Sequence, residues 1–389
     1  MTAPGRKVAV PFAAAAIAVA GIAAFLGGGL RGAGQAPPPA SPFADGVETL
    51  LLVGDAGAPA IDEPELLALA REAAKDPERT LVVFLGDNLY PAGLPAEGDP
   101  ARREGERRLA AQADAALGAG ARVLFVPGNH DWDEMREHGL DAVQREAHFL
   151  ERRSPRLLFA PQGGCPGPVL LPTPSGATLA VLDTQWWLQH EGPRPEGPGS
   201  PCSAKDTDEA VAQLGSAAAQ GPLVLLAHHP LATGGTHGAR SSDWKAHLFP
   251  LRDLDASLWI PLPVLGSMWA TYRDSVGTGQ DLSSGRYRRL RADLARAFEG
   301  HPALFAASGH DHNLQVLEAP VPAARWVLIS GSGMWPSGGA VRKLPSTRFA
   351  SEKAGFMRVR LARGVPPRLT VLETTKDGRS VERFAVDLR

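Results

Sequence analysis

The sequence predicts an α/β protein built around a parallel sheet. The apolar runs at 48–53, 80–84 and 122–126 are separated by two segments with helical periodicity, at 62–73 and 101–117. This alternation is typical of βαβ units, whose strands run parallel. Each apolar run also ends close to a glycine that polar residues follow. Buried strands commonly end in this way at a ligand-binding edge.

Local patterns predict the other elements. We expect the first helix to have Asp62 as its N-cap, Pro64 in its first turn and Glu65 completing a capping box. In the second helix, Leu109 and Ala113 lie on the apolar face. Further helices are expected at 206–219 and 286–298, further strands at 177–182, 223–226 and 303–307, and four strands completing a second sheet at 325–330, 356–361, 368–373 and 381–388.

The composition favours a folded protein and argues against a polyanion-binding role. Of the 389 residues, 44% are hydrophobic, which is enough for a substantial core. The formal net charge of −2 supplies no general basic field, so no nucleic acid is indicated as a partner. The two cysteines, Cys165 and Cys202, both stand in loop-like contexts. In an exported chain, such a pair is expected to form one disulfide.

Residues 1–30 are expected to be a signal peptide or a membrane anchor. Arg6 and Lys7 precede an uncharged run at 8–30 that is long enough to cross a bilayer as a helix. The run is only mildly apolar, which favours cleavage, whereas the weak cleavage site favours an anchor. A Pro/Gly-rich linker at 31–46 follows. The domain at 47–389 is therefore expected to be exported, as a membrane-anchored or a periplasmic or extracellular protein.

Five expected strand ends carry carboxylate, amide and imidazole side chains. The clusters are Gly54-Asp55, Gly86-Asp87, Gly128-Asn129-His130-Asp131, His228-His229 and Gly309-His310-Asp311-His312. Oxygen and imidazole ligands without thiolates suit Mn, Fe or Zn, and two carboxylates with several histidines exceed the needs of one ion. The strand ends therefore predict a centre with two metal ions.

This order of motifs resembles the calcineurin-like metallophosphoesterases over roughly residues 50–313. Tyr90, three residues after Asp87, is similar to the GDxxY variant of the purple acid phosphatases. The resemblance implies a four-layer α/β-β/α sandwich of two mixed sheets flanked by helices. It also implies two sets of metal ligands that share Asp87, namely Asp55, Asp87, Tyr90 and His312 in one set and Asp87, Asn129, His228 and His310 in the other.

The same resemblance implies an acid phosphatase-like hydrolase. Its two cations activate water and neutralise phosphate, His130 protonates the leaving group, and Asp131 is expected to orient His130. His237 resembles a histidine that contacts the substrate phosphate. The expected substrate is a phosphorylated small molecule, cleaved as a monoester. The alternatives are a phosphodiesterase on the same centre and a catalytically silent, metal-bearing binding domain.

Tyr90 and the adjacent histidines His228 and His229 refine the expected metal centre. A cation removes the proton of a phenol more readily the higher its charge, so Tyr90 favours Fe(III), paired with Fe, Mn or Zn(II). Of the adjacent histidines, His228 matches the family's ligand because it stands two residues before Pro230. His229 is therefore expected to lie outside the ligand set.

An insertion at about 239–285 separates the histidine pair from the last motif. Its apolar run at 258–269 is broken by prolines and is too short to span a membrane. Two interpretations stay open. The segment is either a self-packed insertion or a lid or membrane-facing edge, because insertions at the carboxyl ends of strands lie over the catalytic face. Other membrane contact is expected only through the N-terminal segment.

Overall fold

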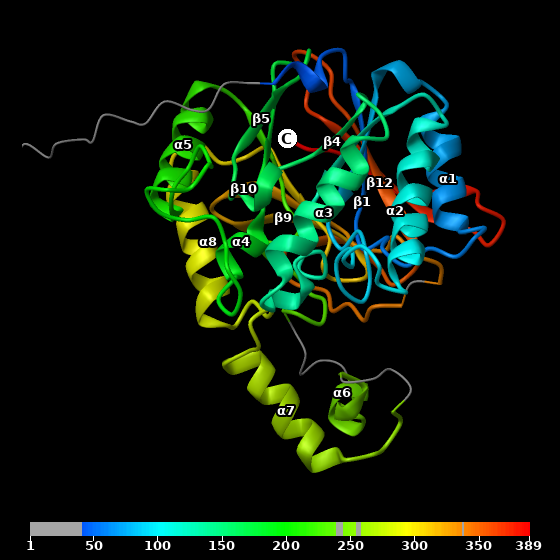
Figure 1. The fold of residues 1–389 in the computed structure, drawn as a ribbon, viewed down its shortest axis with the longest axis vertical. Helices are drawn as coiled ribbons and strands as arrows, with labels where there is room; N and C mark the ends of the chain where they lie inside the picture. Colours follow the sequence, from blue (N-terminus) through cyan, green and yellow to red (C-terminus); the bar gives the residue numbers. More distant parts are fainter. Residues whose placement is uncertain (1–40, 239–243, 254–257, 337) are drawn as a thin grey trace, which may run out of the picture. The chain divides into compact units, whose positions relative to one another are not determined.

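Two mixed sheets of seven strands each form the centre of the computed structural model (Figure 1). The first sheet consists, in order across it, of β14 (Ser380–Asp387), β13 (Arg368–Thr374), β12 (Gly355–Arg360), β1 (Thr49–Val53), β2 (Thr80–Leu85), β3 (Arg122–Val126) and β4 (Leu157–Phe159). The second consists of β11 (Thr347–Ser351), β9 (Leu314–Val321), β10 (Ala324–Ser330), β8 (Phe305–Ser308), β7 (Leu223–Leu226), β6 (Thr178–Val181) and β5 (Val169–Pro172). Helices flank the sheets, so the predicted sandwich of two mixed sheets is confirmed.

The structure describes residues 41–238, 244–253, 258–336 and 338–389. The expected signal peptide or anchor at 1–30 and most of the linker at 31–46 lie outside these residues. Among the residues that are described, no helix has both the length and the hydropathy needed to cross a bilayer.

The α-helices are α1 (Pro64–Ala73), α2 (Arg102–Leu117), α3 (Gly139–Glu151), α4 (Thr184–Leu188), α5 (Thr207–Gln220), α6 (Trp244–Leu248), α7 (Pro263–Ser275) and α8 (Gly285–Ala297). Short 3-10 turns occur at Pro42–Ala44, Pro77–Arg79, Asp133–Met135, Gln162–Gly164 and Pro250–Asp253. Helices α1, α2 and α3 pack against β2, β3 and β4 respectively, while α8 packs against α4 and α5. Figure 1 shows α1 and α2 on one side of the sheets and α5 and α8 on the other.

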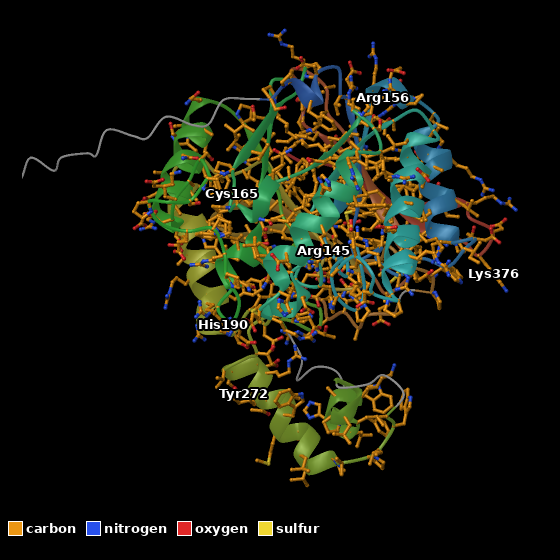
Figure 2. All side chains as sticks on the ribbon, viewed as in Figure 1. Arg145, Arg156, Cys165, His190, Tyr272 and Lys376 are labelled. Atoms are coloured by element: carbon orange, nitrogen blue, oxygen red, sulfur yellow. A yellow bond between two sulfur atoms is a disulfide. The ribbon has the colours of Figure 1, made fainter. Side chains whose placement is uncertain are left out.

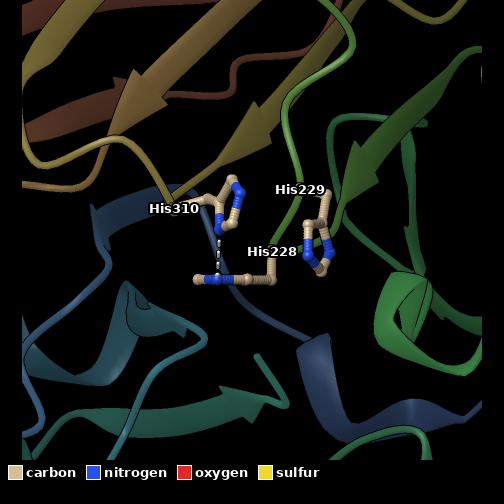
Figure 3. Close-up of side chains that lie close together, drawn as sticks. All are labelled: His228, His229 and His310. Carbon is tan, nitrogen blue, oxygen red and sulfur yellow. Dashed lines mark hydrogen bonds between the residues drawn. The ribbon is translucent and has the colours of Figure 1, made fainter. Parts of the chain in front are cut away.

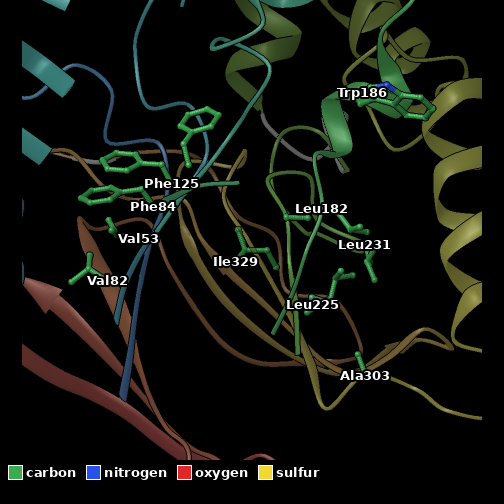
Figure 4. Packing of buried hydrophobic residues seen from close by; sticks show 14 of the residues in the cluster. Val53, Val82, Phe84, Phe125, Leu182, Trp186, Leu225, Leu231, Ala303 and Ile329 are labelled. Carbon is green, nitrogen blue, oxygen red and sulfur yellow. The ribbon is translucent and has the colours of Figure 1, made fainter. Parts of the chain in front are cut away.

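Side chains that point alternately to the two faces of each strand explain these layers. In β1, Leu50 and Leu52 belong to a buried cluster that both sheets share, in which they meet Leu226 of β7. Leu51, between them, belongs to a second cluster that includes helical residues such as Leu69 of α1. Successive side chains of a strand point to opposite faces. Each central strand is therefore buried on both faces, and Figure 4 shows part of the second cluster.

Three C-terminal strands lie in the other sheet from the one expected. The sequence assigned four late strands to the second sheet, but only β10 lies there. Strand β12 pairs antiparallel with β1, and β13 and β14 extend the first sheet from β12. The prediction was wrong because alternating apolar residues specify which face of a strand is buried, and they do not specify which open edge it pairs with.

The start of α1 also differs from the prediction. Glu63, and not Asp62, is the N-cap residue, and no side chain caps the helix. The carboxylate of Glu63 instead accepts hydrogen bonds from the backbone N–H of Ala60 at 3.1 Å and of Trp335 at 2.8 Å. Glu65 does not complete a capping box, because it points into the interior and is fully buried. Burial raises the pKa of Glu65 to about 8.

The insertion folds largely on itself where it is described. Helix α7 packs against α6 and the turn at Pro250–Asp253, and the N–H of Leu262 donates to the carbonyl oxygen of Leu248 at 2.7 Å. This supports the self-packed interpretation. Val264, Met268 and Tyr272 nevertheless remain exposed along α7, and Figure 2 labels Tyr272 among them. The expected insertion residues 239–243 and 254–257 lie outside the described part of the chain.

The two cysteines form the disulfide that the sequence predicts. Cys165 follows the turn at Gln162–Gly164, and Cys202 lies in the loop before α5. Their sulfur atoms are bonded, with the two Cα atoms 5.5 Å apart. The bond therefore links two loops on the side of β5 and β6 to each other.

Candidate metal centre

The carboxyl ends of five parallel strands from both sheets meet at one place. Strands β1, β2 and β3 end there in the first sheet, and β7 and β8 end there in the second. Backbone hydrogen bonds join the two sheets at this edge: Gly54 N–H donates to Ser330 at 2.7 Å. Within each sheet, Asp55 N–H donates to Gly86 at 3.0 Å and Gly309 N–H to His228 at 3.1 Å. The loops that carry the predicted ligands are therefore fixed against one another.

Glycines before the ligands make this close approach possible. A Cβ atom at Gly86 would lie 2.4 Å from Nδ1 of His228, and one at Gly309 would lie 2.4 Å from Oδ2 of Asp55. Both distances are well below van der Waals contact. The Gly-Asp and Gly-His motifs thus need glycine because a ligand from the other sheet occupies the position of its side chain.

Three predicted ligands have a left-handed backbone. The φ angles are +59° at Asp55, +53° at Asp87 and +71° at His310. For residues other than glycine this conformation costs roughly 1–3 kcal/mol, and it persists where the surroundings enforce it. The strain here turns each of these side chains toward the same point instead of along its strand.

The first predicted ligand set converges around the phenol of Tyr90. The Tyr90 hydroxyl lies 3.1 Å from Oδ1 of Asp55, 3.1 Å from Oδ2 of Asp87 and 3.0 Å from Nε2 of His312. Asp55, Asp87 and His312 also form a group whose ligand atoms all lie within 4.8 Å of one another. The hydroxyl has one hydrogen for two carboxylate oxygens, whereas a cation at this point could bind all four atoms.

The second predicted set converges on the other oxygen of Asp87. Oδ1 of Asn129 lies 3.0 Å from Nε2 of His228 and 3.1 Å from Nδ1 of His310. These two ring nitrogens are 3.2 Å apart (Figure 3), and Nε2 of His228 is 3.4 Å from Oδ1 of Asp87. The two oxygens of Asp87 therefore face different groups, as a bridging carboxylate requires.

Outer hydrogen bonds select the ring nitrogens of these histidines. Nδ1 of His228 is 2.8 Å from the carbonyl oxygen of Leu85, and Nε2 of His310 is 3.0 Å from the carbonyl oxygen of Gln280. A carbonyl only accepts, so each of these nitrogens carries a hydrogen and donates it. The opposite nitrogen of each ring then faces the centre and can bind a cation when it carries no proton.

Charge at the centre is concentrated on buried carboxylates. Asp55 is 1% exposed and Asp87 2%. Burial alone would raise the pKa of Asp87, but His228 and His130 lower it far below its usual range. Burial would likewise lower the pKa of His228, but the Asp87 carboxylate outweighs this and raises it to about 9. Within the described part of the chain, histidines are the only ion-pair partners of these two aspartates.

The donor set fits a pair of metal ions. It consists of carboxylate, amide, phenol and imidazole groups, which suit borderline and hard divalent or trivalent ions. Burial and the carboxylates of Asp55 and Asp87 raise the pKa of Tyr90 well above its usual value. A phenolate therefore forms at this position only beside a cation strong enough to outweigh both carboxylates.

His229 lies next to the centre, and its ring nitrogens bond elsewhere. Nδ1 is 2.8 Å from the hydroxyl of Thr184, and Nε2 is 2.7 Å from Oε1 of Gln280. The ring tilts over that of His310 with centroids 4.5 Å apart. This geometry favours His228 as the ligand and a supporting position for His229.

His130 lies at the edge of the centre, and Asp131 does not orient it. Nδ1 of His130 is 2.6 Å from the carbonyl oxygen of Pro91 and 3.5 Å from the carboxylate of Glu134, while Nε2 is 3.9 Å from Oδ2 of Asp87. The ring also meets that of Tyr90 edge to face at 4.5 Å. The expected orienting contact is therefore replaced by Pro91 and Glu134.

Asp131 instead binds two loops together. It is fully buried and accepts hydrogen bonds from the backbone N–H groups of Gly128 at 2.7 Å, Asn88 at 2.8 Å and Leu89 at 3.1 Å. Burial and the charge of Asp87 raise the pKa of Asp131 to about 7. The loop after β2 supplies two of these donors, Asn88 and Leu89, and Gly128 in the loop of Asp131 itself supplies the third. None of these contacts reaches the ring of His130, so the expected orienting contact is not found.

His237 reaches the centre from the loop after β7. Its ring stacks over that of His310, with centroids 4.0 Å apart, and its backbone N–H donates to Asp311 at 3.2 Å. The fully buried Asp311 also accepts from the hydroxyls of Thr233 and Thr236. His237 therefore lies beside His310 of the second ligand set.

Sequence reasoning missed the residues that hold these histidines. Glu134 and Gln280 contact three of them, and the buried Asp281 contacts His237. Glu134 stands four residues after His130 in the same loop. That spacing was the only local signal available for it. Gln280 and Asp281 lie in the insertion, where the sequence shows no pattern that relates them to the centre.

Comparisons with known proteins agree with this architecture. A model of the calcineurin-like phosphoesterase family matches residues 49–260, more than half of the chain. No curated protein matched. Among solved structures, "GAP50 the anchor in the inner membrane complex of Plasmodium" is similar with a TM-score of 0.53 at 15% identity, over 87% of this chain and 88% of that chain. At this identity the similarity shows the fold alone.

Purple acid phosphatase PPD1 from seeds of yellow lupin (Lupinus luteus) is also similar. Its TM-score is 0.49 at 15% identity, and the matched region covers 91% of this chain and 55% of that one.

Proposed function

Because the chain belongs to the calcineurin-like phosphoesterase family, we propose that it hydrolyses phosphate monoesters at a centre of two metal ions. One observation carries the proposal: two sets of ligand atoms meet at the two oxygens of Asp87. Asp55, Tyr90 and His312 complete one set, and Asn129, His228 and His310 complete the other. The domain at 47–389 holds all of them.

The residues around the ions support a hydrolytic step. Two cations held there would lower the pKa of water and neutralise the negative charge of a phosphate under attack. The Nδ1–H of His130 donates to Pro91, which leaves Nε2 to face the centre. The carboxylate of Glu134 lies 3.5 Å from the same Nδ1 and helps to fix the orientation of the ring. His130 can therefore deliver a proton from Nε2 to the leaving oxygen.

The same arrangement supports Fe(III) in the Tyr90 site, with Fe, Mn or Zn(II) in the other. Asp55, Asp87 and a Tyr90 phenolate together bring about three negative charges to the pair. A trivalent ion with a divalent one leaves about two positive charges for substrate and nucleophile, whereas two divalent ions leave about one. Because burial and the two carboxylates raise the pKa of Tyr90, a phenolate there would require the more highly charged ion.

Turnover of aryl phosphates tests the proposal. The protein reconstituted with Mn(II) or with iron is assayed on an aryl monoester and the matching aryl diester. Faster cleavage of the monoester is expected. Faster cleavage of the diester would make the protein a phosphodiesterase, and no cleavage of either ester at full metal content would make it a binding domain.

The proposal includes export from the cytoplasm. The bond between Cys165 and Cys202 supports an oxidising compartment, and Arg6 and Lys7 ahead of the uncharged run support outward transfer of the domain. Membrane contact would come from residues 8–30 if they stay attached. Cell fractionation and sequencing of the mature N-terminus test this. A start near residues 34–41 means a cleaved signal, and an intact Met1 on a cytosolic protein contradicts export.

A further inference from the structure

The end of the insertion reaches the candidate centre through Asp281. One oxygen of this carboxylate lies 3.1 Å from Nδ1 of His237, and the residue is 1% exposed. The His237 side chain itself is 23% exposed. A buried acceptor thus holds a partly exposed ring that would otherwise rotate between rotamers, at an entropic cost when it binds a ligand.

Other insertion residues fix Asp281 in turn. Nε of Arg273, in the last turn of α7, donates to the second oxygen at 2.8 Å, and its Nη2 donates to the first oxygen. The backbone N–H and the hydroxyl of Thr278 each donate to the second oxygen at 2.8 Å. Because a guanidinium forks across a carboxylate, this pair sets the orientation of the acceptor as well as its charge.

The geometry decides which nitrogen of His237 is available. Nδ1 must carry a hydrogen to bond the Asp281 carboxylate, so Nε2 stands on the opposite edge of the ring. Nη2 of Arg273 is 3.5 Å from Nδ1, but it has no lone pair to accept that hydrogen. Arg273 therefore acts on the ring through Asp281.

We propose that Asp281 and Arg273 are positioning residues that hold His237 with Nε2 directed at the phosphate group of the substrate. This rests on the proposed function, and it assigns the insertion a part in the centre: α7 supplies Arg273, and the following turn supplies Asp281. His237 is then held at two points, its backbone by Asp311 and its ring by Asp281.

Phosphate affinity tests the positioning. The Kd of inorganic phosphate is measured by calorimetry on the full-length, zinc-loaded protein, and aryl phosphate turnover is measured separately. His237→Ala is expected to weaken phosphate binding by about 10-fold, the value of one hydrogen bond to a charged group. Asp281→Asn, which offers Nδ1–H a poorer acceptor, is expected to weaken it by several-fold at unchanged zinc content.

The double variant separates positioning from a structural role. If Asp281 acts through His237, Asp281→Asn has no further effect on phosphate Kd in the His237→Ala background. If the fold-changes in phosphate Kd caused by the two substitutions multiply in the double variant, the proposal is overturned. Arg273→Met is expected to resemble Asp281→Asn, whereas Arg273→Lys keeps a donor and recovers part of the affinity. Wild-type affinity in Arg273→Met would remove Arg273 from the assignment.

A surface pair of the same chemistry provides the matched control. Nη2 of Arg296 on α8 lies 2.9 Å from Asp208 on α5, and both side chains are largely exposed. Asp208→Asn and Arg296→Met are expected to leave phosphate Kd and turnover unchanged. A loss in these variants equal to that in Asp281→Asn would overturn the assignment, since it would reflect general destabilisation.

A spectroscopic measurement that does not depend on turnover distinguishes the positioning of His237 from the proposed function. With histidines labelled by ¹⁵N, the zinc-loaded wild type should show a His237 ring protonated at Nδ1, identified by loss of its signals in His237→Ala. Asp281→Asn should shift those signals while the other histidines keep theirs. Unshifted signals overturn the positioning. A wild type that binds phosphate but hydrolyses no ester contradicts only the proposed function.

Discussion

The predicted metal ligands and the two outer histidines, His130 and His237, are held in different ways. Asp87 and His228, central to the predicted ligand set, have side chains at most 2% exposed and follow strands, with backbone groups of neighbouring strands around them, whereas His312 at the edge of the set is 48% exposed. The side chains of His130 and His237 are 21% and 23% exposed and depend on residues from other loops. The ligand geometry therefore follows from the two sheets, whereas the outer histidines follow from loop and insertion residues that can vary separately.

Removing the bridging carboxylate should break the ligand set completely. Asp87→Asn keeps the shape of the side chain and removes its charge, so both ions lose a ligand at once. We expect loss of stoichiometric metal and a fall in turnover of more than about 10³-fold, beyond the effect of losing a single catalytic donor. Elemental analysis and aryl phosphate assays measure both. Full metal content in this variant would contradict a bridging role.

Removing an outer histidine should leave the ligands intact. His130→Ala is expected to retain both metal ions and to lower turnover by about 10²-fold or more, as expected for loss of a general acid. Glu134→Gln, which removes the carboxylate 3.5 Å from Nδ1, should lower it less. Loss of metal in His130→Ala would make this residue a ligand and would remove the distinction between the two groups.

The pH dependence of metal binding should be set by protonation of the predicted ligands and not by the two outer histidines. With a pKa of about 9, His228 is protonated in the metal-free protein at neutral pH. A cation must displace that proton, so the affinity for metal should fall as pH decreases below about 9, by up to tenfold per pH unit. Calorimetry of Zn(II) binding in buffers of different ionisation enthalpy measures the released proton. Affinity independent of pH between 6 and 8 would contradict this.

The smallest effect on turnover is expected when Tyr90, a predicted ligand of one of the two ions, is replaced. The iron-loaded protein should show a visible phenolate-to-iron charge-transfer band, and Tyr90→Phe should abolish it while the remaining ligands still bind metal. Turnover should fall by less than in His130→Ala, since three ligands of that ion remain. An active, iron-replete protein without the band, or a band that survives Tyr90→Phe, would contradict a phenolate ligand.

The chemistry of the ligand set could be predicted from the sequence because each ligand lies within a short, local pattern. A glycine and a carboxylate, amide or imidazole after an apolar run identify a strand end, and parallel strands bring such ends together. The bond between Cys165 and Cys202 was likewise predictable, since the chain has only these two cysteines.

Only the tertiary structure decided which side chains support that chemistry. Asp131 stands beside His130 in sequence yet bonds to the backbone of Asn88, Leu89 and Gly128, because three backbone donors satisfy a buried carboxylate better than one partly exposed ring. His237 and Asp281 are 44 residues apart in the chain, and no local pattern relates them. The sheet that β12 joins depended on the open edge of β1. Contacts of this kind depend on how distant segments pack, and no strand-end motif identifies their residues before the chain folds.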